Sequence, residues 1–190
     1  MKAKSIYLIG FIVMIILQLV LPAQMIFQSE TALNKGKAFK FQTVPVDPND
    51  PFRGKYMTLR YAANSISVDH MDGYEKGLKV YVMLEEDMDG WASVKDIRYD
   101  RPTETTDFAE AIISHVRRDD EGIQHVRFEY PFDRYYLNEK IVEEVEGAYR
   151  EAIQQGSQHT YAIVRVHSGR SVIEDVMIDG TSITSYTEKK

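Results

Sequence analysis

The feature that most constrains this chain is a long apolar run near its N-terminus. Residues 6–27 include no charged side chain and consist mainly of Ile, Leu, Val, Met and Phe. A helix rises about 1.5 Å per residue, so a helix over this run matches the ~30 Å hydrocarbon core of a bilayer. The run therefore predicts one transmembrane helix, and residues 1–27 are expected to form an N-terminal membrane anchor.

A cleaved secretory signal is the alternative for the same residues, because Lys2 and Lys4 form a basic start and Ala23 is small. Signal peptides have an apolar stretch of roughly 7–15 residues and prefer small residues at both positions of the cleavage motif. Leu21 occupies one of those positions. The length of the run and Leu21 favour an uncleaved anchor, while cleavage after Ala23 stays open.

The charges on either side of the run predict its orientation. Lys2 and Lys4 precede it, whereas Gln28, Ser29 and the acidic Glu30 follow it. Basic residues next to a membrane helix are retained on the cytoplasmic side. We therefore expect a single-pass protein of the cell membrane, with a cytoplasmic N-terminus and an extracytoplasmic C-terminal domain.

Beyond the run the chain is acidic and lacks cysteine. Residues 28–190 carry 21 basic and 29 acidic side chains. Nucleic-acid binding needs a basic surface, so nucleic acid is not an expected partner, and anionic lipid headgroups would repel much of the domain. Without cysteine there is no disulfide, no catalytic thiolate and no Cys-ligated zinc. An apolar core must provide the stability, and a domain of this length can supply one.

Short segments with alternating polarity dominate the rest of the chain. Residues 28–36 are predicted to form a short stalk, and residues 37–187 a single domain. Alternation of apolar and polar residues is typical of half-buried strands. The predicted strands cover residues 37–46, 56–61, 78–84, 91–99, 112–117, 123–130, 160–166, 172–178 and 182–186. Turn sequences at residues 87–90, 119–122, 168–169 and 179–180 favour antiparallel hairpins.

One helix is predicted within this domain, over residues 139–155. Asn138 is a suitable N-cap and Gly156 a suitable C-terminal stop, and the apolar residues between them recur at helical spacing. Such a stripe packs on a sheet. The fold class predicted from these elements is a β-dominated α+β domain, an antiparallel sandwich or partly closed barrel with one long packed helix.

A specific motif lies between residues 44 and 61, which read VPVDPNDPFRGKYMTLRY. This segment resembles the GDYXXLXY family of bacterial proteins, because Gly54, Tyr56, Leu59 and Tyr61 fall on the Gly, Tyr, Leu and Tyr of that motif. A weaker resemblance continues through residues 128–139 and on to Gly180. Lys55 stands where the family name has Asp, so the motif is interpreted as structural rather than catalytic.

The resemblance implies an N-terminal membrane segment followed by an extracytoplasmic domain. Members of the family resemble accessory proteins encoded beside multi-spanning membrane proteins, and the resemblance implies no activity.

The residues of the motif also have a physical interpretation. Gly54 allows a positive φ where a loop enters a strand, and Tyr56 and Tyr61, five residues apart, are expected on opposite faces of that strand. Arg53 can pair with Asp47 or Asp50 and fix the proline-containing loop. These residues form a candidate binding or structural motif: Asp47, Asp50, Arg53, Gly54, Tyr56, Leu59 and Tyr61.

A dense aromatic set follows the predicted strand at residues 123–130. Phe128, Tyr130, Phe132, Tyr135 and Tyr136 are explained either by core packing or by an aromatic recognition face. The candidate recognition face comprises Arg134, Tyr135, Tyr136 and Glu139.

No metal, cofactor or catalytic residue is predicted. The acidic stretch at residues 87–90 resembles the start of a calcium loop but lacks enough ligands, and His115 and His125 would make only two ligands even if they lay opposite each other in a hairpin. The leading hypothesis is a non-enzymatic accessory module that binds a multi-spanning membrane protein. The alternatives are an envelope hydrolase that uses carboxylates such as Asp47, Asp50 or Glu139, and a sensor domain for a small ligand.

Overall fold

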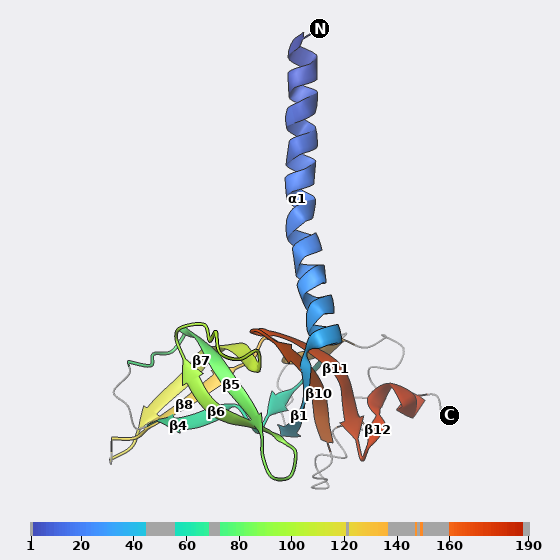
Figure 1. The fold of residues 1–190 in the computed structure, drawn as a ribbon. Coiled ribbons are helices and arrows are strands. Elements are labelled where there is room, and N and C mark those ends of the chain that lie inside the picture. The colour runs from blue at the N-terminus through green and yellow to red at the C-terminus, as the bar shows by residue number, and fades with distance from the viewer. Residues whose placement is uncertain are drawn as a thin grey trace.

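A computed structural model describes residues 2–44, 56–68, 73–120, 122–136 and 160–187, together with Gly147 and Tyr149. A single helix, α1 (Lys2–Lys35), rises out of a strand-rich domain (Figure 1). Its apolar part is exposed along its whole length and is long enough to cross a membrane. The predicted helix at residues 6–27 is therefore confirmed as a helix, and it continues through most of the segment predicted as a stalk.

The last turns of α1 pack directly against the domain. Ala32 is fully buried, and the backbone N–H of Gly36 closes the helix by donating to the Ala32 carbonyl at 2.9 Å. A Cβ on Gly36 would lie 2.3 Å from that carbonyl oxygen and 3.0 Å from the carbonyl oxygen of Val166, so only glycine fits here. The Arg165 guanidinium donates to the Gly36 carbonyl at 3.3 Å, and the Arg170 guanidinium donates to the Gln28 side chain. Helix and domain are thus joined by buried and hydrogen-bonded contacts.

The sheet next to α1 has five antiparallel strands. In spatial order they are β12 (Thr181–Ser182), β11 (Arg170–Ile178), β10 (Thr160–His167), β1 (Lys37–Val44) and β3 (Arg60–Tyr61). Figure 1 shows this sheet directly beneath the helix.

A second five-stranded antiparallel sheet forms the other side of the domain. Its order is β4 (Ser65–Val68), β8 (Gln124–Glu129), β7 (Phe108–Arg118), β5 (Lys79–Glu86) and β6 (Ala92–Arg98). The edge strands β4 and β6 contact each other, so this sheet curls into a nearly closed barrel. The predicted β-dominated fold with a partly closed barrel is confirmed.

A short ribbon of β2 (Tyr56–Thr58) and β9 (Arg134–Tyr136) completes the described strands. Single bridges between Lys40 and Trp91 and between Ala109 and Gly169 join the two large sheets. Side chains from both sheets share one apolar core, whose largest fully buried members include Phe39, Phe41, Phe128, Met57 and Leu59.

Two hairpin turns form where the sequence predicts them. Ser168 and Gly169 connect β10 to β11, and Asp179 and Gly180 connect β11 to β12. All four residues have positive φ angles, as two-residue hairpin turns of this kind require. The Asp side chain and the glycines accept this conformation at low cost, so the turn chemistry of the sequence fixes both hairpins.

Other predicted elements differ from the structure. The strand predicted at residues 182–186 ends at Ser182, and the chain continues as a 3₁₀ helix, η1 (Ile183–Thr187). Ile183 is fully buried there, and the hydroxyls of Ser182 and Thr184 form a hydrogen bond of 2.9 Å. The strand predicted at residues 112–117 begins earlier, at Phe108, and β4 was not predicted at all. Most of the helix predicted at residues 139–155 lies outside the described residues, although Gly147 and Tyr149 are both helical.

Candidate functional site on strands β2 and β9

The motif segment from Tyr56 to Tyr61 is two strands rather than the single predicted one. β2 pairs with β9, whereas β3 pairs with β1, and Leu59 lies between them. The backbone N–H of Leu59 donates to the carbonyl of Asp133 at 2.7 Å. The segment therefore crosses from the surface ribbon to the sheet beneath α1, and Leu59 marks the crossing.

The second half of the motif is part of the core. Leu59 and Tyr61 are only 2% and 3% exposed, and the Tyr61 hydroxyl donates to the Phe132 carbonyl at 2.7 Å. Burial, with a smaller contribution from nearby Tyr149 and Asp133, holds the pKa of Tyr61 well above its ordinary value of 10.0. Tyr61 is therefore a neutral hydrogen-bond donor inside the domain.

Tyr61 belongs to a buried aromatic cluster. Its ring lies 5.2 Å from those of Phe41 and Phe132, and Tyr130 stacks on Phe132 at 4.7 Å. The Tyr130 hydroxyl donates to the Ala63 carbonyl at 2.8 Å, and burial raises the pKa of Tyr130. Core packing thus explains Phe128, Tyr130 and Phe132, which were weighed above as a recognition face.

Tyr56, the first tyrosine of the motif, lies at the surface. Tyr56 pairs with Tyr136 across the ribbon, and their rings are 5.6 Å apart. The Arg134 guanidinium lies 5.0 Å from the centre of the Tyr56 ring and 3.8 Å from an Asp133 carboxylate oxygen. Tyr136 is 67% exposed. Tyr56, Arg134 and Tyr136 therefore form a solvent-facing patch, which we name the ribbon surface.

Arg134 remains fully charged in this arrangement. A hydrogen bond that the guanidinium donates to the Tyr136 hydroxyl oxygen and the nearby Asp133 carboxylate raise the already high pKa of Arg134. A guanidinium stacked on an aromatic ring keeps its in-plane N–H groups available for carboxylate or carbonyl acceptors. The ribbon surface thus combines a fixed cation with two amphipathic rings.

A shallow depression of about 360 Å³ lies beside the ribbon surface. Tyr135 lines this depression and its hydroxyl interacts with Asp175, and burial together with this carboxylate raises the pKa of Tyr135. The Ser171 hydroxyl is buried without a hydrogen-bond partner among the described residues. The residues that line the depression come from β9, β11 and the segment before β9: Pro131, Phe132, Arg134, Tyr135, Tyr136, Ser171, Val172 and Ile173.

The structure brings together only part of the predicted site. Tyr56, Arg134 and Tyr136 meet on the ribbon surface, and Leu59 and Tyr61 lie in the core below. The remaining predicted residues, Asp47, Asp50, Arg53, Gly54 and Glu139, lie outside the described residues. Their predicted pairing and binding roles stay predictions.

Comparison with known proteins finds a match to one protein family. A family model described as "GDYXXLXY protein" matches residues 18–176, which is most of the chain. This chain belongs to the GDYXXLXY family. No curated protein and no solved structure matches it.

In this GDYXXLXY protein the family match begins inside α1 and ends within β11. It therefore includes the second half of the apolar run, the helix–domain junction and both strands of the ribbon surface. The motif in the family name is divided here between core and surface.

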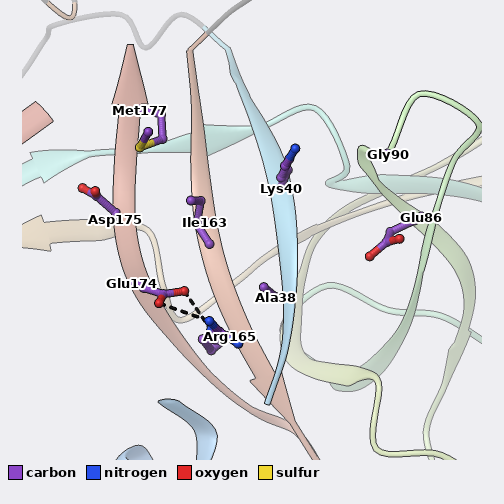
Figure 2. A pocket seen from close by; sticks show the side chains of 9 residues that line it. All are labelled: Ala38, Lys40, Glu86, Gly90, Ile163, Arg165, Glu174, Asp175 and Met177. Atoms are coloured by element: carbon purple, nitrogen blue, oxygen red, sulfur yellow. Dashed lines mark hydrogen bonds and ion pairs between the residues drawn. The ribbon is translucent and has the colours of Figure 1, made fainter. Parts of the chain in front are cut away.

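A second depression, of about 570 Å³, lies on the outer face of β1, β10 and β11, where the β5–β6 hairpin forms one wall (Figure 2). Arg165 and Glu174 make a two-point ion pair on its floor, with N···O distances of 2.7 and 3.2 Å. Lys40 and Glu86 lie on either side of the gap between β1 and the hairpin. These charges were not predicted as a site. Arg165 and Glu174 belong to one hairpin, but Lys40 and Glu86 come near them only because strands distant in the sequence pack together.

The acidic turn at residues 87–90 and the pair of histidines, which resemble metal ligands in the sequence, make hydrogen bonds within the fold. Asp87 accepts hydrogen bonds from the backbone N–H groups of Asp89 and Trp91 at 3.0 and 2.8 Å, so it closes the β5–β6 turn. His115 pairs with Arg127 and His125 pairs with Arg117, so the two histidines are not opposite each other. His125 instead lies 3.0 Å from the Asp119 carboxylate and 2.9 Å from the Ser67 hydroxyl. Among the described residues, no three His, Asp or Glu side chains are grouped to hold a metal ion.

Proposed function

We propose that this GDYXXLXY protein is a membrane-anchored accessory module whose extracytoplasmic domain, residues 37–187, binds a multi-spanning membrane protein. The observation that carries the proposal is the fixed junction between α1 and the domain. Ala32 is buried in the domain only five residues after Phe27, the last residue of the apolar run.

The junction supports a membrane-embedded partner because it determines where the domain lies. Arg170, at the start of β11, donates to Gln28, the residue next to the end of the apolar run. Gly36 is the single residue between α1 and β1 and is closely packed, and the Arg165 guanidinium donates a hydrogen bond to its carbonyl. A domain held in this way stays close to the bilayer surface with a defined orientation. Such preorganisation lowers the entropic cost of binding a partner that is confined to the same membrane.

The ribbon surface is the proposed contact. Tyr and Arg are the residue types most enriched in the energetic centres of protein interfaces. Tyr56, Arg134 and Tyr136 also hold one another in place before any partner binds, through ring and cation–π contacts. The resemblance to accessory proteins encoded beside multi-spanning membrane proteins points to the same class of partner.

Site-specific photo-crosslinking in cells tests the proposal. A benzophenone amino acid replaces Tyr136 in the full-length protein, and a matched control replaces Met88, which is fully exposed at the tip of the β5–β6 hairpin. We expect position 136 to yield one adduct with an integral membrane protein and position 88 to yield none. Adducts only with soluble proteins, or equal adducts from both positions, would contradict the proposal.

A further inference from the structure

Gln18 is a polar residue near the middle of the apolar run. It lies twelve residues after Ile6 and nine before Phe27, which at 1.5 Å per residue is about 18 and 13 Å from the two ends. A glutamine side chain is too short to reach water over either distance. By contrast, Gln24 lies within one turn of Phe27, where a polar side chain can reach the headgroup region.

Pro22 adds a second polar group at the same place. Proline has no backbone N–H, so Pro22 cannot donate the usual helical hydrogen bond to the carbonyl of the residue four positions earlier. That residue is Gln18, and both lie inside α1. Gln18 therefore has both a side-chain amide and a main-chain carbonyl that lacks its normal donor. In hydrocarbon, such groups need partners within the protein.

The described part of the domain does not supply these partners. Gln18 is exposed, as are the apolar residues around it, and α1 meets β10 and β11 only through its last turns. The partner must therefore be another segment at the same depth in the membrane.

We propose that this partner is α1 of a second copy of the chain, and that the two helices pair in parallel through Gln18. The inference rests on the membrane span assumed in the proposed function. A glutamine amide carries both donors and an acceptor, so two copies related by a two-fold axis can bond reciprocally, side chain to side chain or side chain to the carbonyl freed by Pro22. A second copy inserted in the same orientation presents its Gln18 at the same depth.

The residues around Gln18 fit a helix pair. Phe11, Met14, Leu21 and Met25 recur with Gln18 at the alternating three- and four-residue spacing of a coiled-coil seam. All four are exposed on α1. A single polar residue in such a seam fixes its register, and hydrogen-bonding side chains link membrane helices in the same way. Ile16 and Val20 lie on the opposite side of the helix and serve as controls.

Disulfide crosslinking tests the pairing, because the natural chain contains no cysteine. Single-cysteine variants of the purified full-length protein are reconstituted in phosphatidylcholine vesicles and oxidised. We expect Met14→Cys and Leu21→Cys to form dimers at least fivefold more efficiently than Ile16→Cys and Val20→Cys. Absent crosslinks, or equal crosslinks on both sides of the helix, would overturn the pairing.

Substitution of Gln18 tests whether its side-chain amide causes the helices to pair. In the Leu21→Cys background, Gln18→Leu is expected to weaken dimerisation about tenfold, which corresponds to about 1.4 kcal/mol. Gln18→Asn keeps an amide and should retain most of the crosslinking, and Gln24→Leu, the matched removal of a glutamine near the outer end, should change nothing. Equal effects of Gln18→Leu and Gln24→Leu would overturn the role of Gln18.

Two further observations separate this proposal from others. If Leu21→Cys in native membranes crosslinks only to a different protein, the partner is a foreign helix and the pairing between copies is wrong. If alkaline carbonate releases the protein from membranes, α1 does not span the membrane, and the proposed function is wrong as well.

Discussion

The two tyrosines at the ends of the segment from Tyr56 to Tyr61 share a motif but not an environment. Tyr61 is buried against Phe41 and Phe132, and its hydroxyl bonds to a main-chain carbonyl. Tyr56 lies at the surface, between the rings and charges of β9. The chain crosses from one sheet to another between them, at Leu59.

This difference places residues of the core and a residue of the proposed contact surface within one short segment. Leu59 and Tyr61 are buried and connect the surface ribbon to the core. The Tyr56 side chain lies at the surface and is not part of the core. Substitutions at Leu59 and Tyr61 should therefore lower the unfolding free energy of the domain, whereas substitutions on the ribbon surface should change it little. The following predictions test this division.

Leu59→Ala should have the largest effect. Leu59 is fully buried in the shared core, and truncation of a buried leucine costs about 2–5 kcal/mol of unfolding free energy. Thr58→Ala, at the exposed neighbouring position, should cost less than about 0.5 kcal/mol. Urea unfolding of the two variants, followed by circular dichroism, gives both values. Similar losses in the two variants would show that the core does not include this end of the segment.

Tyr61→Phe should have the next largest effect, because it removes one oxygen and leaves the packing intact. The Phe132 carbonyl then loses its donor, and an unsatisfied buried polar group costs about 1–3 kcal/mol. Tyr56→Phe removes the matched oxygen at the surface and should change the unfolding free energy little. An equal cost for the two substitutions would remove the proposed contrast between the tyrosines.

Stability should also fall at alkaline pH. Burial raises the pKa of Tyr61 above 10.0 in the folded state, so the unfolded chain loses this proton first as the pH rises. The contribution is therefore fully present below pH 10 and is lost above it, at up to about 1.4 kcal/mol per pH unit for each buried tyrosine. Unfolding free energies measured at pH 8 and pH 11 should differ less in Tyr61→Phe than in the natural protein. An unchanged difference would mean that Tyr61 titrates normally.

Arg134→Gln should have the smallest effect on stability. The guanidinium is exposed, and a cation–π contact at an exposed site contributes little to the unfolding free energy. The same substitution should nevertheless lower photo-crosslinking from position 136 severalfold, because it removes the charge of the ribbon surface. A variant that loses stability but keeps its crosslinking would reverse the assignment of this residue.

The sequence predicted those features of the fold that depend on neighbouring residues. The apolar run, the alternation along each strand and the glycines in the hairpin turns are local signals, and they correspond to α1, to most strands and to the turns at Gly169 and Gly180. The break at Leu59 was not predictable, because it arises from two different strand partners. The register of β7 and β8, which places Arg127 and not His125 opposite His115, depends on pairing in the same way.

Prediction of the candidate site from the sequence is limited in the same way, because the pairing of distant strands is not a local signal. Tyr56 and Arg134 were each predicted as candidate residues, but in two separate groups, because nothing local to either residue indicates that β2 pairs with β9. The depression that Lys40 on β1 and Glu86 on β5 both line was missed for the same reason. Strand pairing over long sequence separations decides which side chains meet, and a single sequence does not specify it.

Accessibility labelling tests the central claim, which is that α1 spans the membrane and holds the domain outside. Because the natural chain lacks cysteine, Met88→Cys and Ala3→Cys each provide one thiol in an otherwise unreactive protein. A membrane-impermeant maleimide applied to intact spheroplasts should label position 88 and should label position 3 only after permeabilisation. Labelling of position 3 alone, or recovery of the protein in the soluble fraction after alkaline carbonate, would contradict the account.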